Sequence, residues 1–322
     1  MAEEFFNGKK VLITGASGFI GSHMVLRMVR ENADVCVMAR ESSDLWRVED
    51  VLNDIDIRRF DLRDQAALSA QMKQIKPDFI FHLGAYGVDA RQKDYYEAVN
   101  TNIIGTMNLI NAAGAIGCQK FINTGSCAEY GNKTEIIHEG DELTPLSIYG
   151  STKAASVIIA HQIAHEKNID IITLRSFGTF GENEGSHKFF PHLILSILNN
   201  IDINLTFCEQ YRDYCYIENI IDGFVLAAKD KTVKNGIFNI GSGVVHKMKV
   251  FVDLVFKNID TSSKPNYGAV PYRENEMWKQ QPDISKIRDV LGWEQRISLE
   301  DGIIRTIRWY ENNLHKYKNT GR

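Results

Sequence analysis

Three glycines spaced three residues apart, directly after a short apolar run, constrain the fold of this chain more than any other feature. Val11-Leu12-Ile13-Thr14 reads as a buried strand, and the residues after Gly18 have the apolar periodicity of a helix. Glycines at 15, 18 and 21 allow a tight turn, close approach of the backbone to a ligand, and close packing of helix on strand. A phosphate would then lie at the helix N-terminus, where free amides and the helix dipole favour negative charge. The alternative is that these glycines only turn a loop, because their spacing is G-x-x-G-x-x-G and not the dehydrogenase G-x-G-x-x-G.

The first half of the chain alternates short apolar segments with helical patterns, which predicts a parallel sheet covered by helices on both faces. Strands are predicted at 10–14, 34–39, 55–59, 79–83, 120–125 and 169–175. Helices are predicted at 18–31, 65–76, 94–116 and 149–167. Later segments are less regular, with helices predicted at 186–200, at 219–229 and from Leu299, and a strand at 236–240 that can rejoin the sheet.

The predicted fold class is therefore α/β, a doubly wound parallel sheet of the Rossmann type with a smaller, discontinuous α+β lobe. A chain of 322 residues exceeds one comfortable core, which favours two lobes. We expect residues 1–178 and about 211–242 to form the nucleotide-binding domain. Residues from about 179 to 210 and 243 to 322 would then form the substrate-binding lobe.

Composition excludes several classes of partner. A net charge of −4 gives no reason to expect nucleic acid or an anionic membrane. The longest uncharged stretch, 101–119, is interrupted by asparagines and glycines, so it reads as a buried helix and not a membrane span. The acidic N-terminus predicts no signal peptide, and five cysteines without a C-x-x-C pair are typical of free thiols in a reducing cytoplasm. No zinc-ligand spacing is evident, so no metal is expected.

Tyr149 and Lys153 are four residues apart in a predicted helix, which places phenol and ammonium on one face about one turn apart. A nearby ammonium favours the phenolate, so the pKa of the tyrosine is expected to fall from its usual value of about 10. Such a tyrosine can act as an acid or base. The pair alone is a weak signal, because chance pairs on solvated helix faces are common. Its place downstream of the glycine-rich loop makes it informative.

In a doubly wound fold, the residue that ends the second strand meets the adenosine ribose. Arg40 occupies that position, and Ser42 or Ser43 can add hydroxyl donors, which favours the extra phosphate of NADP over NAD. Glu41 leaves NAD open, since a carboxylate there would bind the ribose hydroxyl. Asp61 follows the third strand and can contact adenine, although a helix N-cap explains it as well.

Small residues and a histidine end the fourth predicted strand. Leu83, Gly84 and Ala85 lie where a cofactor must pass close to the backbone, and His82 before them reads as a hydrogen-bonded core residue.

These segments together resemble the extended short-chain dehydrogenase/reductases, in the branch that acts on nucleotide-linked sugars. The resemblance rests on Thr14-Gly15-Ala16-Ser17-Gly18-Phe19-Ile20-Gly21, Asp61-Leu62-Arg63-Asp64, Ser126 ahead of Tyr130-Gly131, Tyr149 with Lys153, Gln210-Tyr211-Arg212-Asp213-Tyr214, and Gln281-Pro282-Asp283 with Leu291-Gly292-Trp293. It extends through nearly the whole chain.

The resemblance implies roles for individual residues. Ser126 would hydrogen-bond the reacting sugar oxygen, Tyr149 would exchange a proton with it, and Lys153 would bind the nicotinamide ribose and lower the tyrosine pKa. The residues expected to bind the cofactor are Gly15, Ser17, Gly18, Phe19, Ile20, Gly21, Arg40, Ser43, Asp61, Leu62, Leu83, Gly84, Ala85, Tyr149 and Lys153. Those expected to bind the substrate are Ser126, His187, Lys188, Arg212, Arg273 and Glu276.

Departures from the family pattern reduce the number of reactions that the resemblance implies. Cys127 and Ala128 replace the acidic pair of the sugar 4,6-dehydratases, which argues against dehydration. Cys127 lies one place from the catalytic cysteine of the GDP-fucose synthases, so 3,5-epimerisation with His187 is an alternative to a buried thiol and a substrate-contacting histidine. Gly178 replaces an asparagine frequent in epimerases and dehydratases.

The resulting hypothesis is a cytoplasmic, NADPH-dependent reductase of a nucleotide-linked 4-keto-6-deoxyhexose, serving deoxysugar or surface-glycan biosynthesis. A nucleotide-sugar 4-epimerase with tightly bound NAD is the alternative enzyme, and a non-catalytic nucleotide-binding protein on the same fold is the alternative from another class. The resemblance also implies a homodimer that packs the helices near 94–116 and 149–167.

Overall fold

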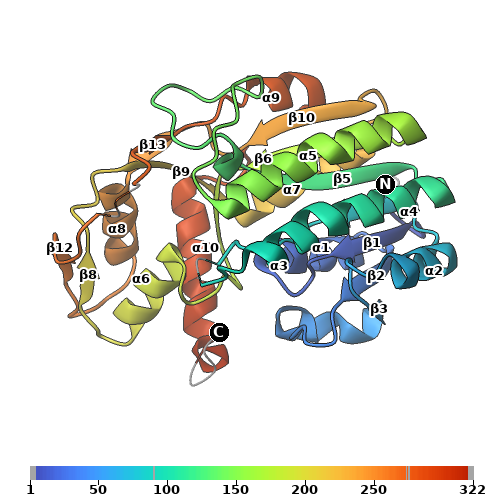
Figure 1. The fold of residues 1–322 in the computed structure, drawn as a ribbon. Coiled ribbons are helices and arrows are strands. Elements are labelled where there is room, and N and C mark those ends of the chain that lie inside the picture. Colours follow the sequence, from blue (N-terminus) through green and yellow to red (C-terminus); the bar gives the residue numbers. More distant parts are fainter. Residues whose placement is uncertain (1–4, 90, 273, 275, 318–322) are drawn as a thin grey trace.

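The computed structural model describes residues 5–89, 91–272, 274 and 276–317. Its main sheet has seven strands in the order β10-β6-β5-β4-β1-β2-β3 (Figure 1), and every neighbouring pair is parallel. The strands are β1 (Lys10–Thr14), β2 (Asp34–Ala39), β3 (Ile55–Arg59), β4 (Phe79–His82), β5 (Lys120–Ser126), β6 (Ile171–Ser176) and β10 (Asn235–Ile240). The doubly wound sheet is confirmed, as is the return of the late strand to it.

Helices cover both faces of this sheet, which explains why its central strands are apolar on both sides. One face carries α1 (Phe19–Arg30) and α7 (Ile217–Lys229), which contact each other. The other carries α2 (Gln65–Ile75), α4 (Gly105–Ile116) and α5 (Ile148–Lys167), seen in front of the strands in Figure 1. The two largest apolar clusters of buried side chains lie on opposite sides of the strands, and a small third one contains Tyr130, Ile137 and Phe177.

A smaller set of strands and helices lies beside the carboxyl ends of the main sheet. Its four-stranded sheet runs β11-β9-β13 with β7 paired to β9, and a second pair joins β8 to β12. The strands are β7 (Gly178–Phe180), β8 (Ile203–Leu205), β9 (Tyr211–Tyr216), β11 (Val245–Lys247), β12 (Pro265–Tyr267) and β13 (Lys279–Gln280). The helices are α6 (Phe189–Leu198), α8 (Met248–Lys257) and α10 (Leu299–Asn312). Helix α9 (Ser285–Leu291) packs instead against β10 and α7 of the main sheet (Figure 1).

One predicted helix is more complex than its sequence pattern indicates. Residues 94–116 contain α3 (Tyr95–Val99), a π-helical turn at Asn100–Ile104, and then α4. The turn carries Asn102, whose side chain bonds both the amide and the carbonyl of Tyr86 at 2.8 and 2.9 Å. A π turn inserts an extra residue into a helix and occurs frequently at functional sites. Here it fixes the chain segment that follows β4.

Short 3₁₀ helices complete the described part of the chain. They are η1 (Trp46–Asp54), η3 (Cys127–Glu129) and η4 (Leu314–Lys316). No helix within the described residues is long and apolar enough to cross a membrane. All five cysteines are free thiols.

Candidate active site

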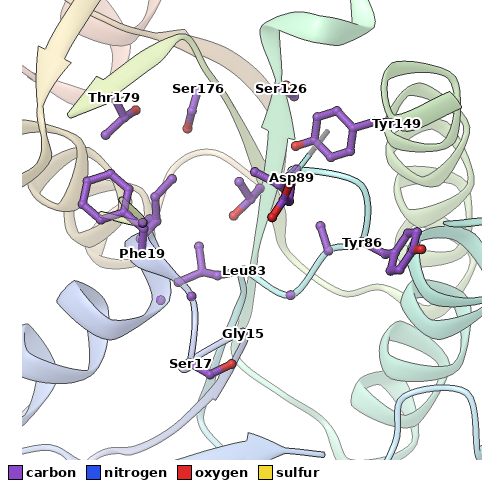
Figure 2. A pocket seen from close by; sticks show the side chains of 18 of the residues that line it. Gly15, Ser17, Phe19, Leu83, Tyr86, Asp89, Ser126, Tyr149, Ser176 and Thr179 are labelled. Atoms are coloured by element: carbon purple, nitrogen blue, oxygen red, sulfur yellow. The ribbon is translucent and has the colours of Figure 1, made fainter. Parts of the chain in front are cut away.

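A cavity of about 600 Å³ lies at the carboxyl ends of the main-sheet strands. Thr14, Ala39, Ser126 and Ser176, which end β1, β2, β5 and β6, all contribute to its wall. β1 is the point from which the chain winds outward in both directions, and ligands of open α/β sheets bind at such a switch point. Figure 2 shows the glycine-rich turn on one side of this cavity and Tyr149 on another.

The structure brings the predicted site residues together in this one cavity. Every residue expected to bind the cofactor lines it: Gly15, Ser17, Gly18, Phe19, Ile20, Gly21, Arg40, Ser43, Asp61, Leu62, Leu83, Gly84, Ala85, Tyr149 and Lys153. So do Ser126, His187, Lys188 and Arg212 from the predicted substrate set. Glu276 contacts Arg212, and Arg273 lies outside the described residues. Their roles remain predictions.

The glycine-rich turn forms a cradle that side chains would fill. Gly15 has a φ of +74°, and a Cβ there would lie 2.6 Å from the amide nitrogen of Gly84. A Cβ on Gly21 would lie 2.1 Å from the carbonyl oxygen of Gly15. Helix α1 starts after Gly18 without a side-chain cap, and its first turn carries no acidic residue. The first-turn amides are therefore available to a phosphate, and the residues fit a dinucleotide.

Arg40 and Ser43 line the cavity at the end of β2, whereas the exposed Glu41 does not. The Arg40 amide donates to the Ser43 hydroxyl at 3.0 Å, which closes a tight turn between them. Arg59, from the end of β3, donates to the carbonyl of Arg40 at 2.8 Å and holds the turn from outside. Arg40 and Ser43, and not Glu41, therefore line the cavity at the end of β2, the strand end at which the fold predicts the adenosine ribose.

The structure distinguishes the two roles that the sequence left open at Asp61, contact with adenine and capping of the next helix. Asp64 is the N-cap of α2 and accepts the Ala67 amide at 2.9 Å. Asp61 lines the cavity and pairs with Arg63 at 2.8 Å. Burial raises the pKa of Asp61, but its bonds to Arg63 outweigh this and hold that pKa below the ordinary value.

The histidine at the end of β4 is a core residue. His82 is 1% exposed and bonds the hydroxyls of Thr14 and Thr106 at 2.8 and 2.9 Å. Burial, with a smaller contribution from the charge of Lys153, lowers the pKa of His82 to about 3. A neutral imidazole thus joins β1 and α4 to the end of β4, beside the cavity.

Ser126, Tyr149 and Lys153 meet on the side of the cavity formed by β5 and α5. Ser126 ends β5 and caps η3, and its hydroxyl accepts the Ala128 amide at 3.2 Å. Ser147 caps α5 by accepting the Gly150 amide at 3.1 Å, which sets where the helix begins. Tyr149 and Lys153 then follow one turn apart, and the Tyr149 hydroxyl points into the cavity that Ser126 also lines (Figure 2).

The titration of Tyr149 differs from the sequence-based expectation. Burial raises the pKa of Tyr149 to about 12, and the lowering effect of Ser126 offsets only part of this rise. Burial also lowers the pKa of Lys153 to about 8, against the opposing effect of Glu129. The expected fall in the tyrosine pKa is therefore wrong for this structure, because the loss of hydration on burial dominates the shift. At neutral pH the phenol carries its proton.

Cys127 and His187 both line the cavity, as 3,5-epimerisation would require. Burial raises the pKa of the Cys127 thiol to about 12, while the charge of Arg212 lowers it. His187 lies 3.5 Å from Asp89 and 3.4 Å from Arg91, and burial lowers its pKa. A protonated thiol is a poor base, so the raised pKa argues against epimerisation by Cys127, whose side chain is only partly buried in the cavity wall. A substrate contact of His187 stays a prediction.

Arg47 is a cavity residue that the sequence did not indicate. From η1 it donates to the carbonyls of Ser17 and Asn183 at 2.8 and 2.6 Å, and its guanidinium lies 4.5 Å from the Trp46 ring. It thereby joins the glycine-rich turn to the segment before His187. No periodic or spacing signal marks such a residue, because both partners are remote main-chain atoms.

The sequence matches one family model over most of its length. The model described as "NAD dependent epimerase/dehydratase family" matches residues 11–241. The chain belongs to that family. This confirms the extended short-chain dehydrogenase/reductase assignment, the fold class and the expectation of an enzyme.

Members of the NAD-dependent epimerase/dehydratase family resemble this chain over nearly its whole length. The dTDP-D-glucose 4,6-dehydratase of Mus musculus is 27% identical over 327 residues, covering 97% of this chain and 91% of that protein. The UDP-glucose 4-epimerase of Thermotoga maritima, solved with UDP-glucose, is 25% identical with a TM-score of 0.87, covering 94% of this chain and 99% of that one. MoeE5, solved with UDP-glucuronic acid and NAD, is 25% identical with a TM-score of 0.83 and the same coverage of each chain. These relatives support a nicotinamide cofactor.

Proposed function

We propose that this protein reduces the C4 ketone of a nucleotide-linked 4-keto-6-deoxyhexose with NADPH. The observation that carries the proposal is that Ser126, Tyr149 and Lys153 line one cavity together with the glycine-rich turn. The sugar oxygen would lie between the two hydroxyls. When bound, NADPH would supply the hydride to the sugar carbon.

Tyr149 is the proton donor in this proposal. Its pKa of about 12 keeps the phenol protonated at neutral pH, and reduction of a ketone needs a proton for the oxygen that becomes a hydroxyl. Ser126 would donate a hydrogen bond to the same oxygen and orient it. Lys153, charged below about pH 8, binds ribose hydroxyls and stabilises negative charge that develops on Tyr149 during transfer.

Arg40 and Ser43 support NADP(H) over NAD(H). Both line the cavity at the end of β2, and a guanidinium with an adjacent hydroxyl suits a 2′-phosphate. The relative solved with NAD leaves NAD as the alternative cofactor.

A nucleoside diphosphate sugar is the proposed substrate. Arg212 enters the cavity from β9 and Lys188 from the start of α6, so two cations lie where a diphosphate would bind. Lys188 donates to the carbonyl of Val88 at 2.9 Å, which draws the loop after β4 toward α6. Arg212 pairs with Glu276, whose carboxylate would accept ribose hydroxyls. The relatives solved with UDP-glucose and UDP-glucuronic acid agree with this substrate class.

A 4-epimerase with retained NAD is the second candidate. Arg47 favours it, because its bonds to Ser17 and Asn183 join two segments of the cavity wall and would slow cofactor release. A non-catalytic nucleotide-binding protein is the third candidate, and the presence of Ser126, Tyr149 and Lys153 in one cavity argues against it.

We propose that the protein forms a homodimer and acts in the cytoplasm. Large apolar side chains are exposed on α3 and α5, among them Tyr95 at 65%, Tyr96 at 83% and Ile158 at 61%. A second copy packed on these helices would bury them.

Released cofactor and NADPH consumption test the proposed reaction. The purified protein is denatured and any released nucleotide identified, and then the absorbance of added NADPH is followed with a panel of nucleotide-linked 4-keto-6-deoxysugars. The proposal expects stoichiometric loss of NADPH with one of them. Release of bound NAD, with no consumption of added NADPH, would establish the epimerase instead.

A further inference from the structure

Three buried hydroxyl groups in the wall of the candidate cavity lack a hydrogen-bond partner. Among the residues that the structure describes, seven buried side-chain oxygen atoms have no such partner. Those of Thr101, Thr124 and Ser176 belong to residues that line the cavity. A polar group that loses its water without gaining a partner destabilises the folded state, so orphaned hydroxyls in a cavity wall indicate a ligand that completes them.

Ser176 lies beside a residue of the candidate site. It is the last residue of β6, it is 9% exposed, and its side chain is directed toward the middle of the cavity (Figure 2). In the parallel pairing of β5 with β6, Ser176 is the register partner of Ser126. Neighbouring strands are about 4.8 Å apart, so the two serines end their strands one strand spacing from each other. Thr124 precedes the end of β5 by two residues and Thr101 lies on the π turn, so neither of them ends a strand.

The part of the wall around Ser176 is mainly apolar. Phe19, Leu83 and Phe177 line the same cavity, and Figure 2 shows Phe19 and Leu83 between Ser176 and the glycine-rich turn. The nearby hydroxyl of Thr179 is engaged, because it donates to the carbonyl of Phe177 at 3.1 Å. Apolar walls with one well-placed polar group suit a flat ring, whose faces pack on the side chains while the polar group fixes its orientation.

The nicotinamide ring of the proposed cofactor has this chemistry. The glycine-rich turn after β1 would hold the pyrophosphate, and Arg40 and Ser43 at the end of β2 would hold the adenosine half. A dinucleotide crosses the switch point of a doubly wound sheet, so its other half would extend over the ends of β4, β5 and β6. The ring is apolar on both faces, and its one hydrogen-bonding substituent is the carboxamide next to C4, the carbon that transfers the hydride.

We infer that the Ser176 hydroxyl binds the carboxamide of the nicotinamide ring and fixes the rotation of that ring in the cavity. A hydroxyl both donates and accepts, so it can pair with the carbonyl oxygen or with the amino group of the carboxamide. With C4 facing a sugar carbon held at Ser126 and Tyr149, the adjacent carboxamide falls within about one strand spacing of Ser126, where Ser176 lies. The inference rests on the proposed function for the place of the sugar, but the contact itself forms without sugar.

The decisive variant is Ser176→Ala, which removes the hydroxyl and little else. Its affinity for NADPH should fall about five-fold, the usual effect of one lost hydrogen bond. Its affinity for adenosine 2′,5′-bisphosphate, which lacks the nicotinamide half, should stay native. Calorimetric titration of protein freed of co-purified nucleotide measures both constants, and NADH with ADP is compared in the same way. Native affinity of Ser176→Ala for the dinucleotides would overturn the inference.

The matched control is Ser263→Ala. Ser263 is 7% exposed and its hydroxyl also lacks a partner, but it is not among the described residues that line the cavity. Both variants should be at least as stable as the native protein without cofactor, because each loses an unsatisfied hydroxyl. Saturating NADPH should raise the melting temperature of Ser176→Ala less than those of the native protein and Ser263→Ala. Equal increases in all three proteins would overturn the inference.

NADPH with ¹⁵N in its carboxamide reports the contact directly. The amide proton signals of the bound cofactor should differ between the native protein and Ser176→Ala, and they should agree between the native protein and Ser263→Ala. Identical signals in all three proteins would overturn the inference.

Binding without sugar separates this inference from the proposed reaction. Weaker NADPH binding by Ser176→Ala supports the inference even if no sugar is reduced. Native NADPH binding together with weaker binding of a nucleotide sugar would overturn it, because the hydroxyl would then serve the sugar.

Discussion

Arg212 and Glu276 form an ion pair at the cavity, with 2.5 Å between Nη2 and Oε1 and little exposure of either side chain. The sequence assigned both residues to substrate binding but not to each other, because 64 positions separate them. The pair pre-orients the guanidinium, which then needs little reorganisation to bind a diphosphate.

Arg212→Ala should therefore weaken binding of the nucleotide sugar by about 1.5–3 kcal/mol, the usual contribution of a charged hydrogen bond. Calorimetric titration with the nucleotide-linked substrate measures this loss. The control is Arg288→Ala, since Arg288 is an exposed arginine paired with Asp289 on α9. Equal affinities of native protein and Arg212→Ala would remove Arg212 from the binding site.

Tyr149→Phe should lower turnover by about 100-fold or more, because the phenol that carries the proton is removed while the ring remains. Cofactor affinity should stay near the native value. Steady-state kinetics with a fluorescence titration of NADPH tests both statements. Tyr96→Phe, which alters a tyrosine that is 83% exposed, is the matched control and should have native kinetics. Unchanged turnover in Tyr149→Phe would end the role assigned to Tyr149.

Arg40→Ala should weaken NADPH binding by about 1.5–3 kcal/mol and NADH binding far less, because only NADPH carries the phosphate that the guanidinium would bind. Dissociation constants of both cofactors are compared by fluorescence. Arg58→Ala on the neighbouring strand, where Arg58 pairs with Asp56 at 2.8 Å, is the control. Equal weakening of both cofactors would show that Arg40 does not select between them.

Glu184 should make the stability of the protein depend on pH. Burial raises its pKa from 4.5 to about 8, with Lys188 and Arg47 opposing. The folded state thus holds this proton more tightly than the unfolded state. The protonated Glu184 therefore contributes fully to the free energy of unfolding below pH 4.5, and this contribution is lost as the pH rises to about 8. Glu184→Gln removes the dependence.

Thermal unfolding at several pH values tests this expectation. The melting temperature of Glu184→Gln relative to the native protein should rise between pH 5 and about pH 8. The control is Glu311→Gln, at an exposed position on α10, whose melting temperature should change with pH as that of the native protein does. If the melting temperatures of Glu184→Gln and the native protein differ by the same amount at every pH, the role assigned to Glu184 is wrong.

Local patterns explain why much of the fold could be predicted. The run before Gly15 and the four-residue spacing of Tyr149 and Lys153 report strand and helix geometry directly. Strand predictions agree with the observed elements to within two residues, including β6 at Ile171–Ser176. The π turn around Asn102 was not predicted, because it depends on bonds to Tyr86 on another segment.

The electrostatics of the site could not be predicted in the same way. Burial of Tyr149 and Lys153 comes from residues distributed over the whole cavity wall, and it reverses the expected direction of the tyrosine pKa. Arg47 was missed because it bonds main-chain atoms 30 and 136 positions away. Ser176 was missed because its neighbour Ser126 is brought to it only by the pairing of β5 with β6.

Transfer of deuterium from C4-deuterated NADPH to the sugar tests the central claim most directly. The protein is incubated with a nucleotide-linked 4-keto-6-deoxyhexose and the deuterated cofactor, and the product is analysed by mass spectrometry and NMR. We predict a 6-deoxyhexose with one deuterium at C4 for each NADPH oxidised. Conversion of a nucleotide sugar into its C4 epimer, with no deuterium from added NADPH, would contradict the claim.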